Sequence, residues 1–287
     1  MDMQLNYDNV MTLAAPSDER GGEHHLYALV DHGAIPGLIA QLKKSGLKWA
    51  SLFEGSRDEG ALEVAPILVQ IRSGVKRAPG KSVMNWIFEQ GRYSSSILFL
   101  YSPLNTSDLA QRLAARLDVS LPAGVEMLLR FFDGRVFEEL MKVLQAEQKT
   151  MFLNAARAWW FVDRVGNLQL CDSRFSEVDS QHVPLVLTAA QETALIDASE
   201  IDQVAMLLGA VMPFEFESMH EVKRVSFLSE NIATARSYNI TSANDLTMYC
   251  AMAMTHGDDF HQNSPWASHF LKIREGRLTM DDAMQID

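Results

Sequence analysis

Short apolar runs alternate with amphipathic segments between residues 26 and 171, and this alternation constrains the fold more than any other feature of the sequence. Leu26–Asp31, Pro66–Ile71 and Ser96–Tyr101 are apolar runs of strand length, each followed by polar, glycine or proline residues. Lys81–Gln90, by contrast, places its apolar residues on one side of a helix. Strands that alternate with helices predict an α/β (α+β) lobe whose sheet is covered by helices.

The same alternation continues through the rest of this lobe. Further strands are expected at Trp49–Phe53 and Glu126–Phe132, and a hairpin is expected around Gly166. Helices are expected at the remaining amphipathic segments, which are Pro36–Gly46, Thr106–Leu117, Arg135–Leu144 and Glu147–Ala155.

The strand signal ends near residue 183, and only helical patterns follow. These patterns cover Ala189–Ala198, Ile201–Val211, Phe216–Ser237, Asp245–His256 and Trp266–Glu275. Thr188-x-x-Gln191 and Ser242-x-x-Asp245 are spaced so that their side chains satisfy free backbone donors at the start of a helix. The sequence therefore predicts a flexible leader at residues 1–22, the α/β lobe at residues 23–182 and an all-helical C-terminal lobe at residues 183–287.

The chain is acidic, with a formal net charge of −12. Because phosphate groups repel a surface of this sign, the charge argues against non-specific binding of nucleic acid or of an anionic membrane. Most of the excess lies in residues 183–287, which hold 15 acidic and 6 basic side chains. This acidity is either an ordinary solvated surface or one that steers a basic partner toward the helical lobe.

Cysteine content and hydropathy indicate the compartment. The two cysteines, Cys171 and Cys250, exclude a disulfide framework and a multi-cysteine zinc site. The first 22 residues lack the apolar core of a signal peptide. No apolar run approaches the roughly 20 residues that a membrane-spanning helix needs. We therefore expect a cytoplasmic protein with no membrane partner and no nucleic-acid partner.

Gly74–Ser82 is the segment that comes nearest to an enzyme motif, because it lies between a predicted strand and a predicted helix as a phosphate-binding loop does. Five residues separate Gly74 from Gly80, whereas the phosphate-binding loop has four. Pro79 also removes one backbone N–H donor. A flexible basic loop is the preferred interpretation, and a nucleotide-binding enzyme that uses residues 74–82 is the alternative.

A second polar cluster contains His256, Asp258 and His261, whose imidazole and carboxylate groups can ligate metals. The two histidines are five residues apart with a glycine between them, so they do not share a helix face. A polar loop at a helix end is expected, and metal binding is left open. Because no nucleophile motif occurs either, we predict no catalytic residue, no metal and no cofactor.

Eight of the fifteen methionines lie after residue 183. Methionine is flexible and polarizable, so it suits surfaces that repack around different apolar partners. It also fills cores, and Met248 and Met252 lie on one face of a predicted helix beside Leu246 and Tyr249. Both interpretations stay open.

The order of several short motifs resembles one family. These are Tyr27–Asp31, Ile35–Leu38, Leu52–Gly55, Val64–Val69 and Leu129–Val136, followed by Thr241–Asp245, His256–Phe260 and Trp266. Together they are similar to the adaptor (chaperone) proteins of bacterial type VI secretion, over residues 26–164 and again in the helical tail. One departure is Gly134, where that family usually has proline. It loosens the turn but leaves Asp133 and Arg135 in place.

The resemblance implies a protein that is not an enzyme. Such adaptors bind a cognate type VI effector, which is a toxin, in the cytoplasm. They help to load it onto the VgrG or PAAR spike protein. The expected partners are therefore an effector and a spike protein.

An adaptor needs an apolar surface that shields an effector segment and can still release it. We expect a cleft between the two lobes to contact the effector, because apolar residues are frequent beside the predicted lobe junction. These residues are Phe214, Phe216, Met219, Met252 and Trp266.

Arg130, Asp133 and Arg135 are a further candidate group, since they follow the predicted strand Glu126–Phe132. Asp133 is placed to cap the helix that follows, and Arg130 to pair with it. A structural role is preferred for these residues, and a partner-binding role is the alternative.

Overall fold

The structure is a computed structural model of the chain, and it describes all residues except 1–2, 15–23, 75, 78–79, 180–183 and 285–287. The chain divides into unit 1, Met1–Leu195, and unit 2, Ile196–Asp287. The predicted lobe boundary lay after residue 182. The division instead falls inside the helix α7, Ala189–Val211, because the first residues of that helix pack on unit 1. Gln191, for example, donates from Nε2 to the carbonyl oxygen of Val143.

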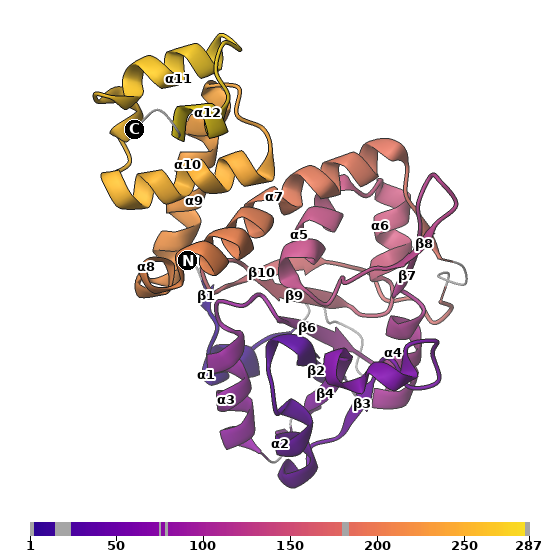
Figure 1. The fold of residues 1–287 in the computed structure, drawn as a ribbon. Helices are drawn as coiled ribbons and strands as arrows, with labels where there is room; N and C mark the ends of the chain where they lie inside the picture. Colours follow the sequence, from indigo (N-terminus) through magenta and orange to yellow (C-terminus); the bar gives the residue numbers. More distant parts are fainter. Residues whose placement is uncertain (1–2, 15–23, 75, 78–79, 180–183, 285–287) are drawn as a thin grey trace. The chain divides into compact units, whose positions relative to one another are not determined.

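Unit 1 is built around an eight-stranded sheet in which every described pairing is antiparallel (Figure 1). Its strand order is β1 (Met3–Gln4), β10 (Asn167–Asp172), β9 (Ala158–Val162), β6 (Ile97–Ser102), β2 (His25–Asp31), β4 (Pro66–Ser73) and β3 (Trp49–Ser51), with β5 (Lys76–Arg77) paired to β4. In this sheet β2, β3, β4 and β6 confirm the strands predicted at Leu26–Asp31, Trp49–Phe53, Pro66–Ile71 and Ser96–Tyr101. β9 and β10 confirm the hairpin predicted around Gly166.

Helices cover both faces of this sheet. The helices of unit 1 are α1 (Tyr7–Met11), α2 (Leu38–Ser45), α3 (Lys81–Gly91), α4 (Thr106–Ala114), α5 (Gly134–Val143) and α6 (Ala146–Leu153), with short 3₁₀ helices at η1 (His32–Ala34) and η2 (Glu59–Val64). Because side chains alternate along a strand, Phe99 and its neighbour Leu100 in β6 point to opposite faces. The ring of Phe88 in α3 lies 5.6 Å from that of Phe99.

On the other face, Phe137 of α5 stacks on Trp159 of β9 at 5.5 Å. Trp159 is the cross-strand partner of Leu100, which places α5 on the face opposite α3. The predicted α/β (α+β) lobe with a helix-covered sheet, followed by a helical C-terminal region, is therefore confirmed.

A second, three-stranded sheet has the order β11 (Leu185–Val186), β7 (Asp118–Ser120) and β8 (Glu126–Leu128). The predicted strand Glu126–Phe132 was too long, because β8 ends at Leu128 and does not enter the main sheet. Phe131 is instead fully buried and packs edge-on against Phe152 at 5.3 Å. An apolar run marks burial, but it does not say whether a strand or a loop carries it.

The N-terminal segment differs from the expected flexible leader over residues 3–14. Leu5 and Val10 are fully buried, and β1 pairs with β10. Arg72 donates to the carbonyl oxygens of Met11 and Leu13, both at 2.6 Å. These contacts fix residues 3–14 on unit 1, although the sequence of this segment has no strong periodicity. The remainder of the predicted leader lies outside the described residues.

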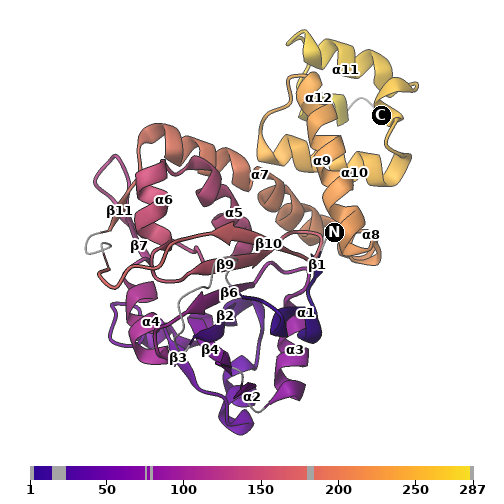
Figure 2. The same cartoon turned by 180° about the vertical axis from the view of Figure 1, so that it is seen from behind.

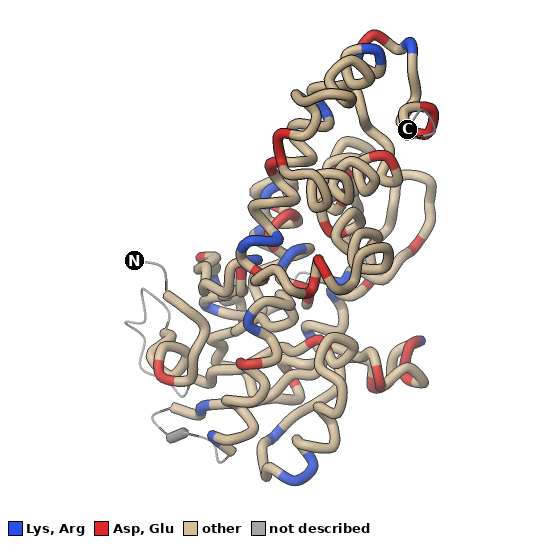
Figure 3. The backbone as a smooth tube through the Cα atoms, turned by 60° about the vertical axis from the view of Figure 1, so that its left-hand side comes forward, with Lys and Arg blue, Asp and Glu red and all other residues tan. Residues whose placement is uncertain are grey.

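Unit 2 is helical. It contains the C-terminal part of α7, then α8 (Pro213–Ser218), α9 (Glu221–Ser237), α10 (Ala243–His256), the 3₁₀ turn η3 (Phe260–Gln262), α11 (Trp266–Arg274) and α12 (Met280–Met284). Its core is a cluster of aromatic rings in which Phe270 meets Tyr249 edge-on at 5.4 Å and Phe260 edge-on at 5.3 Å. Residues 196–287 carry 14 acidic and 6 basic side chains, spread along the unit (Figure 3).

Both predicted capping motifs are confirmed. Thr188 Oγ1 accepts from the Gln191 backbone while Gln191 Oε1 accepts from the Thr188 backbone. Ser242 Oγ accepts from the backbone N–H of Asp245 at 3.1 Å.

The helix boundaries differ in two places. The two helices predicted between residues 189 and 211 form one helix, α7, and the pattern Phe216–Ser237 divides into α8 and α9. Among the described residues, no helix is both apolar and long enough to span a membrane.

Candidate functional site

Arg130 lies on a surface of unit 1 that is assembled from distant parts of the chain. Its guanidinium donates from Nη2 to Asp31 Oδ2 at 2.7 Å, although 99 residues separate the two. The same carboxylate accepts the backbone N–H of Gly33 at 2.9 Å. Arg130 was predicted to pair with Asp133, and this was wrong, because the described ion pair of Arg130 is with Asp31. Arg130 lies two residues beyond the end of β8.

The motif segments that carry the sequence resemblance meet around Asp31. Besides the Arg130 contact, the backbone N–H of His32 donates to the carbonyl oxygen of Ala65 at 3.3 Å. The backbone N–H of Leu52 donates to the carbonyl oxygen of Pro66 at 2.9 Å. Segments near residues 31, 52, 65 and 130 therefore form one continuous piece of structure, where β2 ends and β4 begins.

This piece of structure exposes apolar side chains. Val64 is 54% exposed and Leu62 is 40% exposed, and both line a cavity of about 640 Å³ together with Gly33 and Ile39. Arg130 is itself 55% exposed and lies over the ring of Phe132 at 5.6 Å. We call Asp31, Gly33, Leu62, Val64 and Arg130 the Asp31 surface. Sequence analysis missed Leu62 and Val64, because an exposed and a buried aliphatic residue have the same signature in a single sequence.

Asp133 and Arg135 have a structural role in this arrangement. Asp133 is the N-cap of α5, and its Oδ1 accepts the backbone N–H of Arg135 at 3.0 Å. The Arg135 guanidinium also donates to both carboxylate oxygens, at 3.0 and 2.7 Å. Asp133 is buried, so this bidentate contact and the cap satisfy a charge that would otherwise be costly to bury.

The five apolar residues predicted to contact an effector have different environments in unit 2. Phe216 and Met252 are buried in the core of the unit. The Arg224 guanidinium lies over the ring of Phe216, 5.2 Å from the ring centroid. Met219 and Trp266 are half-buried. Phe214 is 85% exposed. Phe216 and Met252 are therefore core residues, because they point inward from α8 and α10, and Phe214 is the one of the five that is available to a partner.

Other apolar residues near Phe214 are also exposed. Met206 and Val211 near the end of α7 are 68% and 67% exposed. The methionines thus divide between the two roles that the sequence left open: Met252 and Met280 belong to the core, and Met206 faces solvent.

The segment His256–His261 makes contacts within unit 2. Nδ1 of His261 and the hydroxyl of Tyr249 are joined by a hydrogen bond of 2.8 Å in a buried position. Asp258 Oδ1 accepts from Asn231 Nδ2 at 2.9 Å. His256 lies against the ring of Trp266 at 6.0 Å. Across the described residues, no group of three or more histidine, cysteine, aspartate or glutamate side chains has metal-site geometry.

The segment Gly74–Ser82 turns back on the strand that precedes it. Lys76 and Arg77 form β5 and pair antiparallel with Ser73 and Arg72 of β4. Gly80 then precedes α3 with a positive φ of 93°. Residues 75, 78 and 79 lie outside the described residues. The described part is thus a hairpin followed by a helix.

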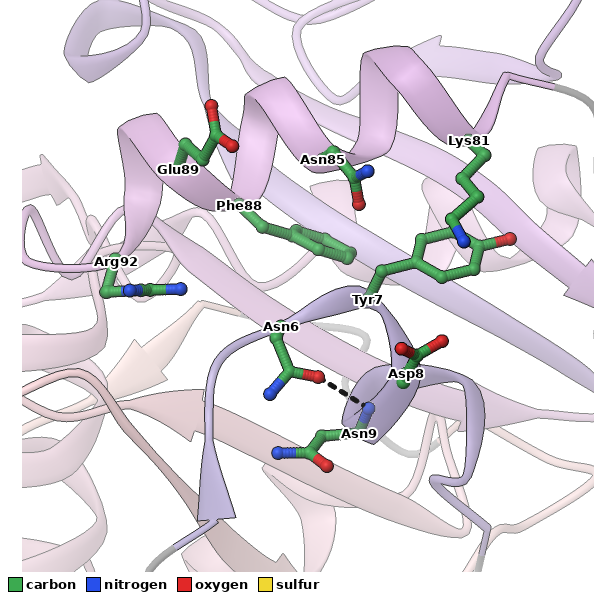
Figure 4. A pocket seen from close by; sticks show the side chains of 9 residues that line it. All are labelled: Asn6, Tyr7, Asp8, Asn9, Lys81, Asn85, Phe88, Glu89 and Arg92. Atoms are coloured by element: carbon green, nitrogen blue, oxygen red, sulfur yellow. Dashed lines mark hydrogen bonds between the residues drawn. The ribbon is translucent and has the colours of Figure 1, made fainter.

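A further cavity lies between α1 and α3 and has a volume of about 540 Å³ (Figure 4). The Lys81 ammonium lies over the ring of Tyr7 at 4.8 Å, and Arg92 donates from Nη2 to the carbonyl oxygen of Leu5 at 3.0 Å. Asp8 and Glu89 supply two negative charges against these two positive ones. The cavity is where the N-terminal segment packs on α3, and its balanced charges select no anion or cation.

Burial keeps the Cys250 thiol and the Tyr249 hydroxyl of unit 2 protonated. Desolvation raises the pKa of the Cys250 thiol from 9.0 to about 12, and it raises the pKa of the Tyr249 hydroxyl as well. Both groups are neutral near pH 7. Cys250 is therefore an inert core thiol.

Comparison with known proteins identifies a domain in unit 1. Residues 26–151 match the family model described as a domain of unknown function, DUF4123. Searches of the curated proteins and of the solved structures found no match. The matched segment contains all five of the motif segments between residues 27 and 136, and it ends inside α6. Over residues 26–151, just under half of its length, this chain is thus similar to the DUF4123 domain.

Proposed function

We propose that the protein is a cytoplasmic, non-catalytic adaptor that binds a type VI secretion effector and helps to load it onto a VgrG or PAAR spike protein. The observation that carries the proposal is the convergence of the resemblance motifs on the Asp31 surface. Asp31 and Arg130, from two separate motifs, meet at 2.7 Å, and the motif residue Val64 is exposed beside them. If these motifs served only to form the core, the side chain of Val64 would be buried with the others.

The Asp31 surface has the composition of a replaceable docking site. Leu62 and Val64 offer apolar area to an effector segment, and Arg130 offers exposed hydrogen-bond donors at the rim. Contacts of this kind shield apolar residues of a partner from water, and a competing partner can displace them. Leu62, Val64 and Arg130 all lie within residues 26–151, the part of the chain that matches the DUF4123 domain.

Co-purification with an effector tests this function. The protein is co-expressed with the toxin encoded beside its gene, and the captured toxin is measured by affinity purification. We expect Val64→Asp to abolish capture, because a charge in an apolar contact must be desolvated. Val178→Asp is the matched control, since Val178 is also a highly exposed valine of unit 1.

The outcomes decide the proposal. Capture by the wild-type protein that is lost in Val64→Asp and kept in Val178→Asp supports it. Failure of the wild-type protein to capture any toxin or spike protein encoded in its own gene cluster contradicts it.

A further inference from the structure

A second cavity of unit 1 is lined by three cationic side chains. Lys149 comes from α6, Arg157 precedes β9 and Arg174 follows β10; the end of α6 lies beside these strands (Figure 2). The cavity has a volume of about 480 Å³, and Asp172 is the acidic residue that lines it. Its formal charge is thus two positive units, in a protein whose net charge is −12.

These three cations form no ion pair with the described residues. None of them takes part in an ion pair or a side-chain hydrogen bond there, and Nε of Arg157 is buried without an acceptor. Arg116, which also lies close to α6, shows the usual situation. It is fully buried and donates to Asp179, Asn154 and the carbonyl oxygen of Phe152.

Unpaired cations in one cavity are unfavourable for the free protein. Like charges repel each other, and a buried guanidinium nitrogen without an acceptor loses hydrogen bonds to water that nothing replaces. An anion that enters removes both penalties and gains charge-assisted hydrogen bonds. The other two cavities described above differ in this respect, because acidic residues line them in equal number to the basic ones: Lys81 and Arg92 with Asp8 and Glu89, and Lys43 with Glu63.

The lining also indicates the kind of anion. Besides the charged residues it contains Thr150, Leu153 and Ser173, and no aromatic side chain on which a nucleotide base would stack. The three cations come from separate elements around a space larger than one carboxylate. This arrangement suits several carboxylates on one extended chain.

We infer that this cavity binds an acidic segment of a protein partner, with Arg157, Lys149 and Arg174 contacting its carboxylates. The inference rests on the proposed adaptor function, since the partner is the effector or the spike protein. We call the cavity with these three residues the Arg157 pocket. It is a site separate from the Asp31 surface, because the two cavities share no lining residue.

Binding of a labelled hexaglutamate peptide to the full-length protein tests the inference without an effector. Fluorescence anisotropy at low ionic strength measures the Kd. We expect Lys149→Gln/Arg174→Gln to raise the Kd by about tenfold or more, because charge-assisted hydrogen bonds are lost. Lys44→Gln, an exposed lysine of unit 1 outside the pocket, is the matched control and changes the Kd by about twofold at most.

Arg157→Gln is a second variant, whose folding is checked by circular dichroism. If Arg157→Gln does not fold, the Lys149→Gln/Arg174→Gln variant still decides the test. This variant is expected to fold, because Arg174 is exposed and Lys149 is half-buried. Hexaglutamine, which lacks the charges, is expected not to bind.

Three results would overturn the inference: no hexaglutamate binding by the wild-type protein, equal weakening by Lys44→Gln and by the pocket variants, or tighter pocket-dependent binding of ATP than of hexaglutamate. The last result would assign the pocket to nucleotides. Failure here leaves toxin capture through Val64 unaffected, so the two proposals fail independently.

Discussion

The backbone N–H of Gly134 donates a 2.6 Å hydrogen bond to the carbonyl oxygen of Ser95. Ser95 adopts a positive φ of 51°, which is unusual for a residue with a side chain. A Cβ atom on Gly134 would lie 2.8 Å from the carbonyl oxygen of Val162 and 3.1 Å from that of Ser95. The start of α5 is thus pressed against the ends of two strand segments. In this chain the position requires glycine, although proline is usual there in the adaptors that the sequence resembles.

Gly134→Pro is therefore expected to destabilise the protein. Proline is normally well tolerated at the first position of a helix, but here it removes the donor to Ser95 and adds atoms where a Cβ does not fit. We expect Gly134→Ala to lower the free energy of unfolding by about 1–3 kcal/mol, and Gly134→Pro to lower it further. Urea denaturation measures both.

Gly60→Ala is the control, because a Cβ there meets no atom within 4 Å. It should change the stability by about 0.5 kcal/mol at most. A Gly134→Pro variant as stable as the wild-type protein would show that α5 does not need the contact with Ser95.

Arg130 and Asp133 are expected to separate partner binding from stability. Asp133→Ala removes a helix cap and the bidentate acceptor of Arg135, and should cost about 1–2 kcal/mol of folding free energy. Arg130→Gln removes the charge of an arginine that is more than half exposed and leaves an amide that can still donate to the buried Asp31, so its cost should be about 1 kcal/mol. Toxin capture is expected to fall in Arg130→Gln. Unchanged capture in a folded Arg130→Gln variant would remove Arg130 from the docking surface.

Phe214 and Phe216 are two residues apart and should respond in opposite ways. Phe216→Ala opens a cavity in the core of unit 2 and is expected to cost about 3 kcal/mol or more. Phe214→Ala should change stability by about 0.5 kcal/mol at most, because the side chain is exposed. Thermal unfolding of both variants measures this difference, and an equal loss of stability would mean that Phe214 is covered in solution.

Stability is expected to fall above about pH 9, because burial raises the pKa of Cys250 from 9.0 to about 12 in the folded protein. Between these values the unfolded chain loses the thiol proton and the folded chain keeps it. The stabilisation is therefore complete below the pKa of the unfolded thiol and is lost as the pH rises through 9 toward 12. Cys250→Ala should flatten this part of the curve. The raised pKa of Tyr249 adds a contribution of the same sign at higher pH.

Nucleotides are expected to have no effect on thermal stability. The described part of Gly74–Ser82 pairs as a hairpin with β4, which is a poor arrangement for wrapping phosphates. A nucleotide site occupied at 100 times its Kd would stabilise the protein by about 2.7 kcal/mol. A melting curve with ATP or GTP and magnesium measures this. A clear upward shift would favour the nucleotide-binding alternative over the adaptor.

The strands of the main sheet could be predicted because their signal is local. Leu26–Val30 and Ile97–Tyr101 are unbroken apolar runs, and in the structure they are buried on both faces. The caps at Thr188 and Ser242 were likewise predictable, since a cap depends on residues within one turn.

The functional surfaces were less predictable. Phe214 and Phe216 are both apolar and close in sequence, and only the direction in which each leaves α8 makes one a core residue and the other a surface residue. Val64 belongs to a motif of the resemblance, but nothing in the sequence marks its side chain as exposed. The short β11 was similarly hidden, because two residues carry too little periodicity to detect.

What the sequence determined by itself is the set of local elements: which segments form strands and helices, where the helices start, and that the second part of the chain is helical. The tertiary structure decided which distant residues meet. It paired Arg130 with Asp31 across 99 residues, and it gathered Lys149, Arg157 and Arg174 around one cavity without acidic partners. The reason is physical: periodicity and capping act within a few residues of the chain, whereas ion pairs, cavities and exposure depend on packing between elements that the sequence does not order in space.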